Sequence, residues 1–455
     1  MATNIICESP YIRDNGDGDL RLNLRSAANG ANGEIRVKFP DLNQLAGVTS
    51  PAAVDFFFIS CLVYGIDRFV VRHDESTDGW SREISATFPV YNLNVWNDCK
   101  MLLANALSFL TGDYWEVNFV QNTFQIPTEP ISDDYSSKDF AQVSLFSGGL
   151  DSLIGAIDFL GKPENADQNI LLVSHFDYQM KGPNREQDEI FEKFPNEYRT
   201  RIKRVSLAEV SLAQTSKRNV EKTFRSRSLL FLGIAVLAAD YQKNKIVVPE
   251  NGSVSLNYPL SSSRRGSCST RTTHPRFIEF VIDLLAGLGL NNQICNPYEF
   301  KTKGEMVVEC ENADLLGSLI KTSNSCGKRG HPVHRTIANS SHCGVCMPCT
   351  YRKASLLDVV DETVYGDDLN KLHVGRNNTP FFLSKQGQDL NACFDFLGTE
   401  LSDDEIRQEL VVSGIHDFSK LATYIALVKR TRNELRHLID QTCIIEERRI
   451  QAGLQ

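Results

Sequence analysis

Two glycines flanked by serines stand between a short apolar segment and a longer one. They lie in FAQVSLFSGGLDSLIGAIDFLGKP, which covers Phe140 to Pro163. Glycines let backbone N–H groups approach an anion without a Cβ atom in the way, and a following helix N-terminus adds a favourable dipole. The chain contains no G-x-x-x-x-G-K-[ST] motif, and G-x-G-x-x-G is absent from this stretch. The pattern predicts a phosphate-binding turn, with a plain Gly-Gly turn as the alternative.

Four cysteines form a second group with chemical potential. Cys343, Cys346 and Cys349 make a C-x2-C-x2-C pattern, and Cys326 lies upstream in the same segment. Thiolates at this spacing can surround one metal ion in tetrahedral geometry, and four of them leave no open position for water. A structural zinc site is therefore predicted. An iron–sulfur cluster and free thiols are the alternatives.

Three histidines share the loop of the cysteine cluster and could replace one of its ligands. They are His331, His334 and His342. We interpret them as surface or substrate-side residues, because the four cysteines already complete a tetrahedral shell.

Composition limits the class of protein. The chain has 455 residues, 42% hydrophobic and 23% charged, which suits a soluble protein of about three domains. The net charge of −9 disfavours nucleic acid as a partner. The longest apolar runs are shorter than the roughly 18 residues that span a bilayer, so no membrane partner is expected. Twelve cysteines without a secretory signal indicate a reducing, cytoplasmic location.

The order of apolar segments predicts three regions. Residues 1–135 have the pattern of an α+β accessory domain, and residues 357–455 that of a helical cap or oligomerisation element. In residues 136–356 the strand candidates QVSLF, QNILLVSH, IKRVSL, NKIVVPE and NQICNP alternate with helices that begin at Asp151 and near Arg185, Arg227 and Pro275. Such alternation is typical of an open parallel α/β sheet. Ligands bind beyond the carboxyl ends of such strands, where the glycine pair falls.

Two groups of arginines are candidate anion ligands. The helix after Arg227 is apolar on every side and should be buried, so Arg225 and Arg227 at its start oppose the helix dipole. Phosphates bound there would offset the unfavourable interaction between these charges and the helix dipole. The alternative is that both arginines are solvated near Glu221. The loop SSSRRGSCSTRTTHP is rich in donors that suit a carboxylate or phosphate, or it is simply exposed.

The glycine segment resembles the PP-loop of the ATP pyrophosphatase superfamily, whose fold is of the adenine nucleotide α hydrolase-like (HUP) type. The resemblance implies ATP cleavage between the α and β phosphates, with Asp151 placing Mg²⁺. Ser174 and His175, in VSHFDY, correspond to the adenine pocket. The remaining implied ATP-binding residues are Phe146, Ser147, Gly148, Gly149, Leu150 and Ser152.

A PP-loop followed by a cysteine loop (residues 326–349) resembles the 7-cyano-7-deazaguanine synthase (QueC) family over residues 140–356. The resemblance puts Lys303, in NPYEFKTKGEMV, near the phosphates as a catalytic residue together with Asp151 and Arg227. Arg227 matches the arginine of the family's Arg-Asn segment, and Ser228 replaces the asparagine of that segment. The family's Asp-x-x-x-Tyr-Pro-Asp-Cys-Arg substrate segment is absent, and NGSVSLNYPLSSSRRGSCSTRTTHPRF takes its place. The substrate-binding candidates are therefore Arg225, Asn251, Gly252, Arg264, Arg271, Thr272, His274 and Arg276.

The additional N- and C-terminal regions resemble the elongated QueC-like proteins of antiphage defence operons (Qat and type IV CBASS). This implies an enzyme that adenylates 7-carboxy-7-deazaguanine with ATP, Mg²⁺ and a structural Zn²⁺. The acyl group would pass to an amine, expected on a partner protein encoded in the same operon. The alternatives are nitrile synthesis from ammonia, a PP-loop tRNA-modifying enzyme, and a non-catalytic ATP-binding scaffold.

Overall fold

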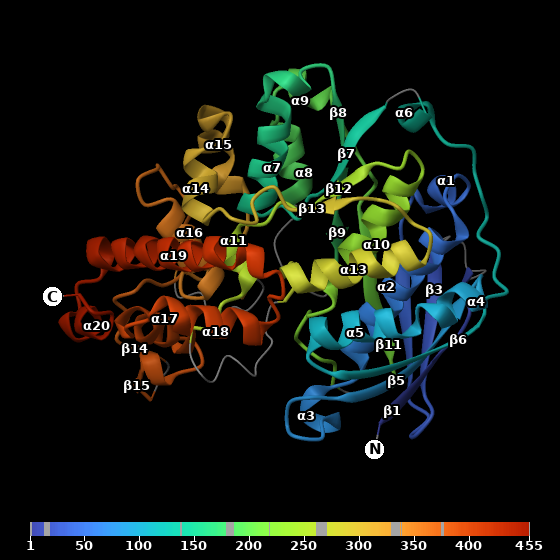
Figure 1. The fold of residues 1–455 in the computed structure, drawn as a ribbon, viewed down its shortest axis with the longest axis horizontal. Helices are drawn as coiled ribbons and strands as arrows, with labels where there is room; N and C mark the ends of the chain where they lie inside the picture. Colours follow the sequence, from blue (N-terminus) through green and yellow to red (C-terminus); the bar gives the residue numbers. More distant parts are fainter. Residues whose placement is uncertain are drawn as a thin grey trace.

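The computed structural model describes residues 2–12, 19–136, 139–178, 186–217, 219–260, 271–328, 337, 339–374 and 377–454. Two sheets dominate it (Figure 1). The larger has eight strands in the order β6-β5-β1-β3-β4-β11-β9, with β2 paired to β3. Its strands are β1 (Thr3–Cys7), β2 (Tyr11–Ile12), β3 (Leu20–Ser26), β4 (Asn32–Lys38), β5 (Glu83–Val90), β6 (Tyr114–Gln121), β9 (His175–Phe176) and β11 (Ala208–Thr215).

The smaller sheet has five strands in the order β10-β8-β7-β12-β13, and every neighbouring pair is parallel. They are β7 (Phe140–Leu145), β8 (Asn169–Val173), β10 (Ile202–Arg204), β12 (Lys245–Val247) and β13 (Ile294–Cys295). Four of the five lie within the predicted strand segments, and β7 overlaps the segment QVSLF but begins two residues before it, so the expected parallel α/β arrangement is confirmed. The PP-loop fold itself stays a prediction. The strand order reverses between β7 and β12, which is where ligands bind in open parallel sheets.

Helices surround both sheets. The N-terminal ones are α1 (Leu42–Ala46), α2 (Pro51–Phe69), α3 (Arg72–Glu75), α4 (Leu93–Asp98), α5 (Lys100–Thr111) and α6 (Asp133–Ser136). Those that follow are α7 (Leu150–Gly161), α8 (Glu186–Lys193), α9 (Asn196–Arg199), α10 (Arg227–Asp240), α11 (Gly252–Leu256), α13 (Pro275–Gly287), α14 (Lys303–Val308), α15 (Ala313–Leu319) and α16 (Met347–Ser355). The last are α17 (Gln388–Gly398), α18 (Asp403–Ser413), α19 (Leu421–Thr442) and α20 (Glu446–Gln451), beside a small sheet of β14 (His373–Val374) and β15 (Thr379–Pro380).

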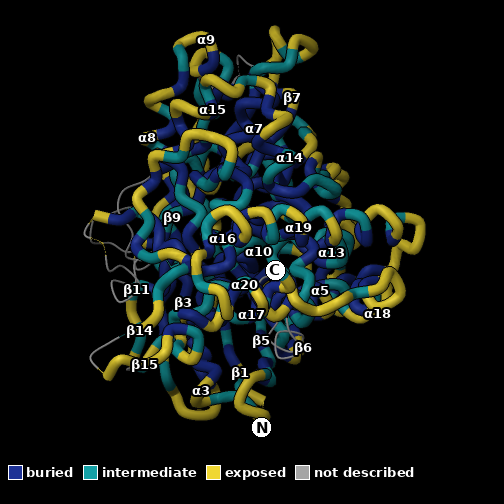
Figure 2. The backbone as a smooth tube through the Cα atoms, turned by 90° about the vertical axis from the view of Figure 1, so that its left-hand side faces the viewer, coloured by how far each residue is buried: buried dark blue, intermediate teal, exposed yellow. Residues whose placement is uncertain are grey.

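Helix α10 lies in the centre of the molecule, where buried positions are concentrated (Figure 2). All its residues from Leu229 to Asp240 are buried, as its uniformly apolar sequence predicts. It packs against α2 and against β7, β8 and β12. One apolar core therefore extends from the larger sheet to the smaller.

The larger sheet uses two strands from beyond residue 135. Strand β11 pairs antiparallel with β4, and β9 adds to β11 in parallel. The predicted boundary at residue 135 stays a prediction, although this pairing ties the two sides of it together. Within the described chain, no helix combines the length and apolarity needed to cross a membrane.

Candidate functional site

The glycine turn follows β7 directly and leads into α7. Gly148 has φ +81°, a left-handed conformation that favours glycine, and Gly149 is the N-cap of α7. Ser147 Oγ accepts from the N–H of Gly149 at 3.3 Å and lies 3.3 Å from Ser152 Oγ. Within the described residues, the N–H groups of Ser147, Gly148 and Asp151 make no hydrogen bond. The turn thus presents donors at a helix N-terminus, an arrangement suited to an anion.

Asp151, in the first turn of α7, meets Lys303 and Asn251. The Lys303 ammonium contacts Asp151 Oδ1, and Asn251 Nδ2 donates to Oδ2 at 2.7 Å. All three residues are buried. Burial would raise the pKa of Asp151, but the Lys303 ammonium and these hydrogen bonds lower it to about 2. The structure therefore brings together three of the predicted residues from separate segments, around an ionised carboxylate.

Glu250 is a further acidic residue at this place, and the sequence analysis missed it. Its Oε1 lies 3.4 Å from the Asn251 amide nitrogen that also serves Asp151. Burial, and then the Asp151 carboxylate, hold the pKa of Glu250 well above its usual range. The raised pKa favours the protonated carboxyl group, which can donate a hydrogen bond to Asp151. The signal was available, because Glu250 follows β12, the strand next to β7.

The other predicted ATP-binding residues have internal partners. Phe146 is buried, and its carbonyl accepts from Ser174 Oγ at 2.8 Å. Leu150 is also buried. His175 Nε2 lies 3.1 Å from the Val210 carbonyl, and Nδ1 accepts from Arg227 Nε at 3.4 Å. Burial and the Arg227 charge lower the pKa of His175 to about 3, so the ring is neutral. Its role, and that of Arg227, stay predictions.

Three of the predicted substrate-binding arginines contact aromatic rings. Arg225 is 5% exposed, stacks on Trp80 and donates to the Thr111 carbonyl, so the alternative of a solvated residue is wrong for it. Arg271 lies over Phe109 and donates to its carbonyl at 3.2 Å. Arg276 lies over Phe280.

The remaining substrate-binding candidates that the structure describes lie at the start of α11 or just before α13. His274 caps α13, with a pKa lowered to about 3 by burial and then by the charge of Arg271. Thr272 is half-buried beside it. The N–H of Gly252 donates to the Lys301 carbonyl at 2.8 Å. Arg264 lies outside the described residues. Substrate-binding roles stay predictions for this whole set.

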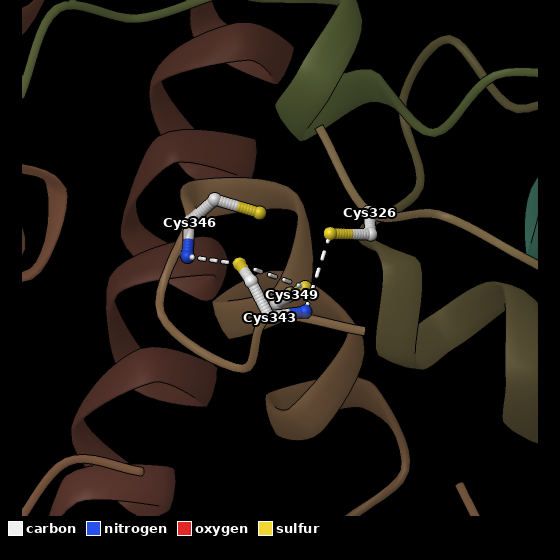
Figure 3. A group of neighbouring side chains, drawn as sticks. All are labelled: Cys326, Cys343, Cys346 and Cys349. Carbon is white, nitrogen blue, oxygen red and sulfur yellow. Dashed lines mark hydrogen bonds between the residues drawn. The ribbon is translucent and has the colours of Figure 1, made fainter. Parts of the chain in front are cut away.

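The four cysteines converge from two segments, and Figure 3 shows their sulfur atoms turned toward one another. The four Sγ atoms lie within 4.8 Å of one another, and all four residues are buried. The N–H of Cys343 donates to Cys326 Sγ, and that of Cys346 to Cys343 Sγ, both at 3.3 Å. Such bonds stabilise thiolates, the form that binds metal. The predicted ligand set is thus assembled and could bind a metal ion such as zinc.

The cysteine segment supports the glycine turn. The N–H of Asn324 donates to the Gly148 carbonyl at 2.9 Å, and Ser325 Oγ accepts from the N–H of Leu150 at 3.3 Å. Ser325 is held by His342, whose Nε2 accepts from its N–H at 3.2 Å. His342 is fully buried, so its interpretation as a surface residue is wrong. His331 and His334 lie outside the described residues.

These features define a mixed α/β protein with a parallel sheet and a buried four-cysteine group. No protein family model, curated protein or solved structure matches the chain.

Proposed function

We propose that the protein is an ATP-dependent ligase that activates a carboxylic acid as its acyl adenylate. The observation that carries this is the juxtaposition of the glycine turn with Asp151 and Lys303 where the order of the parallel strands reverses. The free N–H groups of the turn would bind the departing pyrophosphate. The buried Lys303 ammonium would compensate the phosphate charge.

The chemistry needs orientation more than acid–base catalysis. A carboxylate oxygen attacks the α-phosphorus of ATP, the bond to the β-phosphate bridging oxygen breaks, and pyrophosphate leaves. An amine nitrogen then attacks the acyl carbon, AMP leaves with the carboxylate oxygen, and the amine loses a proton. Asp151 would hold Mg²⁺, which would supply charge neutralisation when bound. Hydrogen bonds from Asn251 orient the Asp151 carboxylate for this.

The acid that we propose is 7-carboxy-7-deazaguanine, and the acceptor is an amine of a partner protein in antiphage defence. The resemblance to the QueC family supports this choice. The buried four-cysteine group beside the glycine turn is consistent with it.

One experiment tests the reaction. The purified protein is incubated with ATP, Mg²⁺ and 7-carboxy-7-deazaguanine, and AMP, ADP and pyrophosphate are quantified. We expect AMP and pyrophosphate, lost in Lys303→Ala and retained in the matched control Lys301→Ala, whose side chain pairs with Glu309 instead. ADP as the product, or equal activity in both variants, would refute the proposal. Adding ammonia or the partner separates nitrile formation from conjugation by product mass.

A further inference from the structure

Lys303 lies at the start of a short helix that is held at both sides. Its neighbour Thr302 is the N-cap of α14 and forms a capping box with Glu305, with hydrogen bonds of 3.1 and 2.8 Å. A second carboxylate also reaches this turn. Glu434, in α19, accepts from the Thr302 hydroxyl and from the N–H of Gly304. Glu434 therefore binds the residues immediately before and after Lys303.

The contact with Glu434 depends on close approach. A Cβ atom at Gly304 would lie 2.5 Å from Glu434 Oε1, so glycine leaves the space that the carboxylate occupies. One turn earlier on α19, Arg430 Nε donates to Glu305 Oε1 at 2.6 Å. The Arg430 guanidinium also donates to the Phe300 carbonyl at 2.7 Å. Two successive turns of α19 thus form hydrogen bonds with the residues at the start of α14.

The same helix contacts the segment that carries Asn251. Thr431 Oγ1 lies 2.5 Å from Ser253 Oγ in α11, whose N-cap is Asn251. Leu427 lies so near Gly252 that an added Cβ there would approach it to 2.6 Å. Figure 1 shows α19 alongside α11 and α16. Both partners of Asp151 therefore stand next to residues that α19 holds.

We infer that α19 positions Lys303 and Asn251 toward Asp151, and that Glu434 is a positioning residue for Lys303. The C-terminal region is then part of the support of the site and not a separate cap. This inference rests on the proposed function only for what Lys303 does to the nucleotide. The placement of the ammonium can be tested without ATP.

The first test measures the accessibility of Lys303 with an amine-reactive reagent, read by peptide mass spectrometry on the full chain. In the parent protein Lys303 is 5% exposed and paired, so its labelling is slow. Glu434→Ala should accelerate it about tenfold, the effect of losing hydrogen bonds to a charged group. The matched control Asn433→Ala, an exposed neighbour on α19, should not.

A second variant separates positioning from general loss of structure. Glu434→Gln keeps the volume and one acceptor, so an intermediate labelling rate is expected, with a thermal midpoint close to that of the parent. Labelling of Lys303 that stays at the parent rate in Glu434→Ala overturns the inference. So does a labelling increase shared by Lys217, a half-buried lysine just after β11 that pairs with Glu75.

The last arm is a double-variant cycle on ATP affinity. If Glu434 acts through Lys303, Glu434→Ala weakens ATP binding in the parent and has no further effect in the Lys303→Ala background. Additive losses overturn the inference. If the parent binds no ATP, the proposed function fails while the labelling result still decides the positioning role.

Discussion

Two halves of the candidate site are supported in different ways. The glycine turn rests on the cysteine segment, through backbone groups of Asn324 and the hydroxyl of Ser325. Lys303 rests on α19, through a carboxylate and a guanidinium. The first support lies beside four buried cysteines that could bind a metal ion. The second depends on a helix of 22 residues, whose buried face belongs to the same apolar cluster as the four cysteines. The two supports share this cluster but differ in the groups that reach the site, so we expect local changes to affect one half more than the other.

We propose that the four-cysteine group binds a metal ion, and loss of that ion should have the largest effect. Four buried thiolates without an ion repel one another, and structural zinc contributes on the order of 10 kcal/mol in small domains. Cys343→Ser should lower the free energy of unfolding by more than about 4 kcal/mol. Amide exchange should accelerate at 147–150 and 323–326 before it does at 302–308.

The control for metal loss is Cys443→Ser, a buried cysteine outside the cluster. It should keep the metal and the exchange pattern of the parent. If a chelator accelerated amide exchange equally at the glycine turn and at 302–308, the two halves would share one support.

Acidification should lower the free energy of unfolding through His175, in β9. The pKa of His175 is lowered to about 3 by burial and then by Arg227, so between pH 6.5 and 3 the unfolded chain alone takes up the proton. Folding stability therefore falls as pH falls. The expected loss between pH 7 and 5 is about 2 kcal/mol.

Denaturant titrations at the two pH values check this, with His175→Gln as the comparison. Between the two pH values the variant should lose less stability than the parent, and the difference should equal the contribution of His175. The contribution of His274 remains in both proteins. A pH dependence of equal size in the variant would mean that His175 is not the group responsible.

Removal of one hydroxyl from the cysteine segment should have a smaller, local effect. Ser325→Ala deprives the N–H of Leu150 of its acceptor, which costs about 1 kcal/mol of unfolding free energy. Amide exchange at Leu150 should accelerate. Ser318→Ala, whose exposed hydroxyl bonds only within α15, is the control. If amide exchange at Leu150 did not change, the Ser325 hydroxyl would not be supporting the glycine turn.

The smallest effect is expected from Ser253→Ala, at the contact between α11 and α19. The Thr431 hydroxyl keeps its bond to the Leu427 carbonyl at 2.9 Å, so no buried group loses every partner. We expect a loss of about 0.5 kcal/mol in denaturant titrations. A larger loss of unfolding free energy than in Ser325→Ala would mean that the contact with α19 contributes more to stability than the contact with the cysteine segment.

Much of the smaller sheet could be predicted because its signals are local. Each strand of the smaller sheet lies in or beside a short apolar run that alternates with helices, and hydrophobic periodicity reports that directly. The strand over 208–215 was not among the predicted segments. Its position depends on pairing with β4, about 170 residues earlier in the chain, which periodicity cannot report.

The glycine turn, the four-cysteine group and the alternation of strands and helices could be predicted, because residue type and short spacing encode them. Three contacts became visible only in the folded chain: Glu250 with Asp151, the buried His342 with Ser325, and α19 with the residue before Lys303. These contacts join residues far apart in the chain. Their formation depends on how whole helices and sheets pack, and no local pattern carries that information.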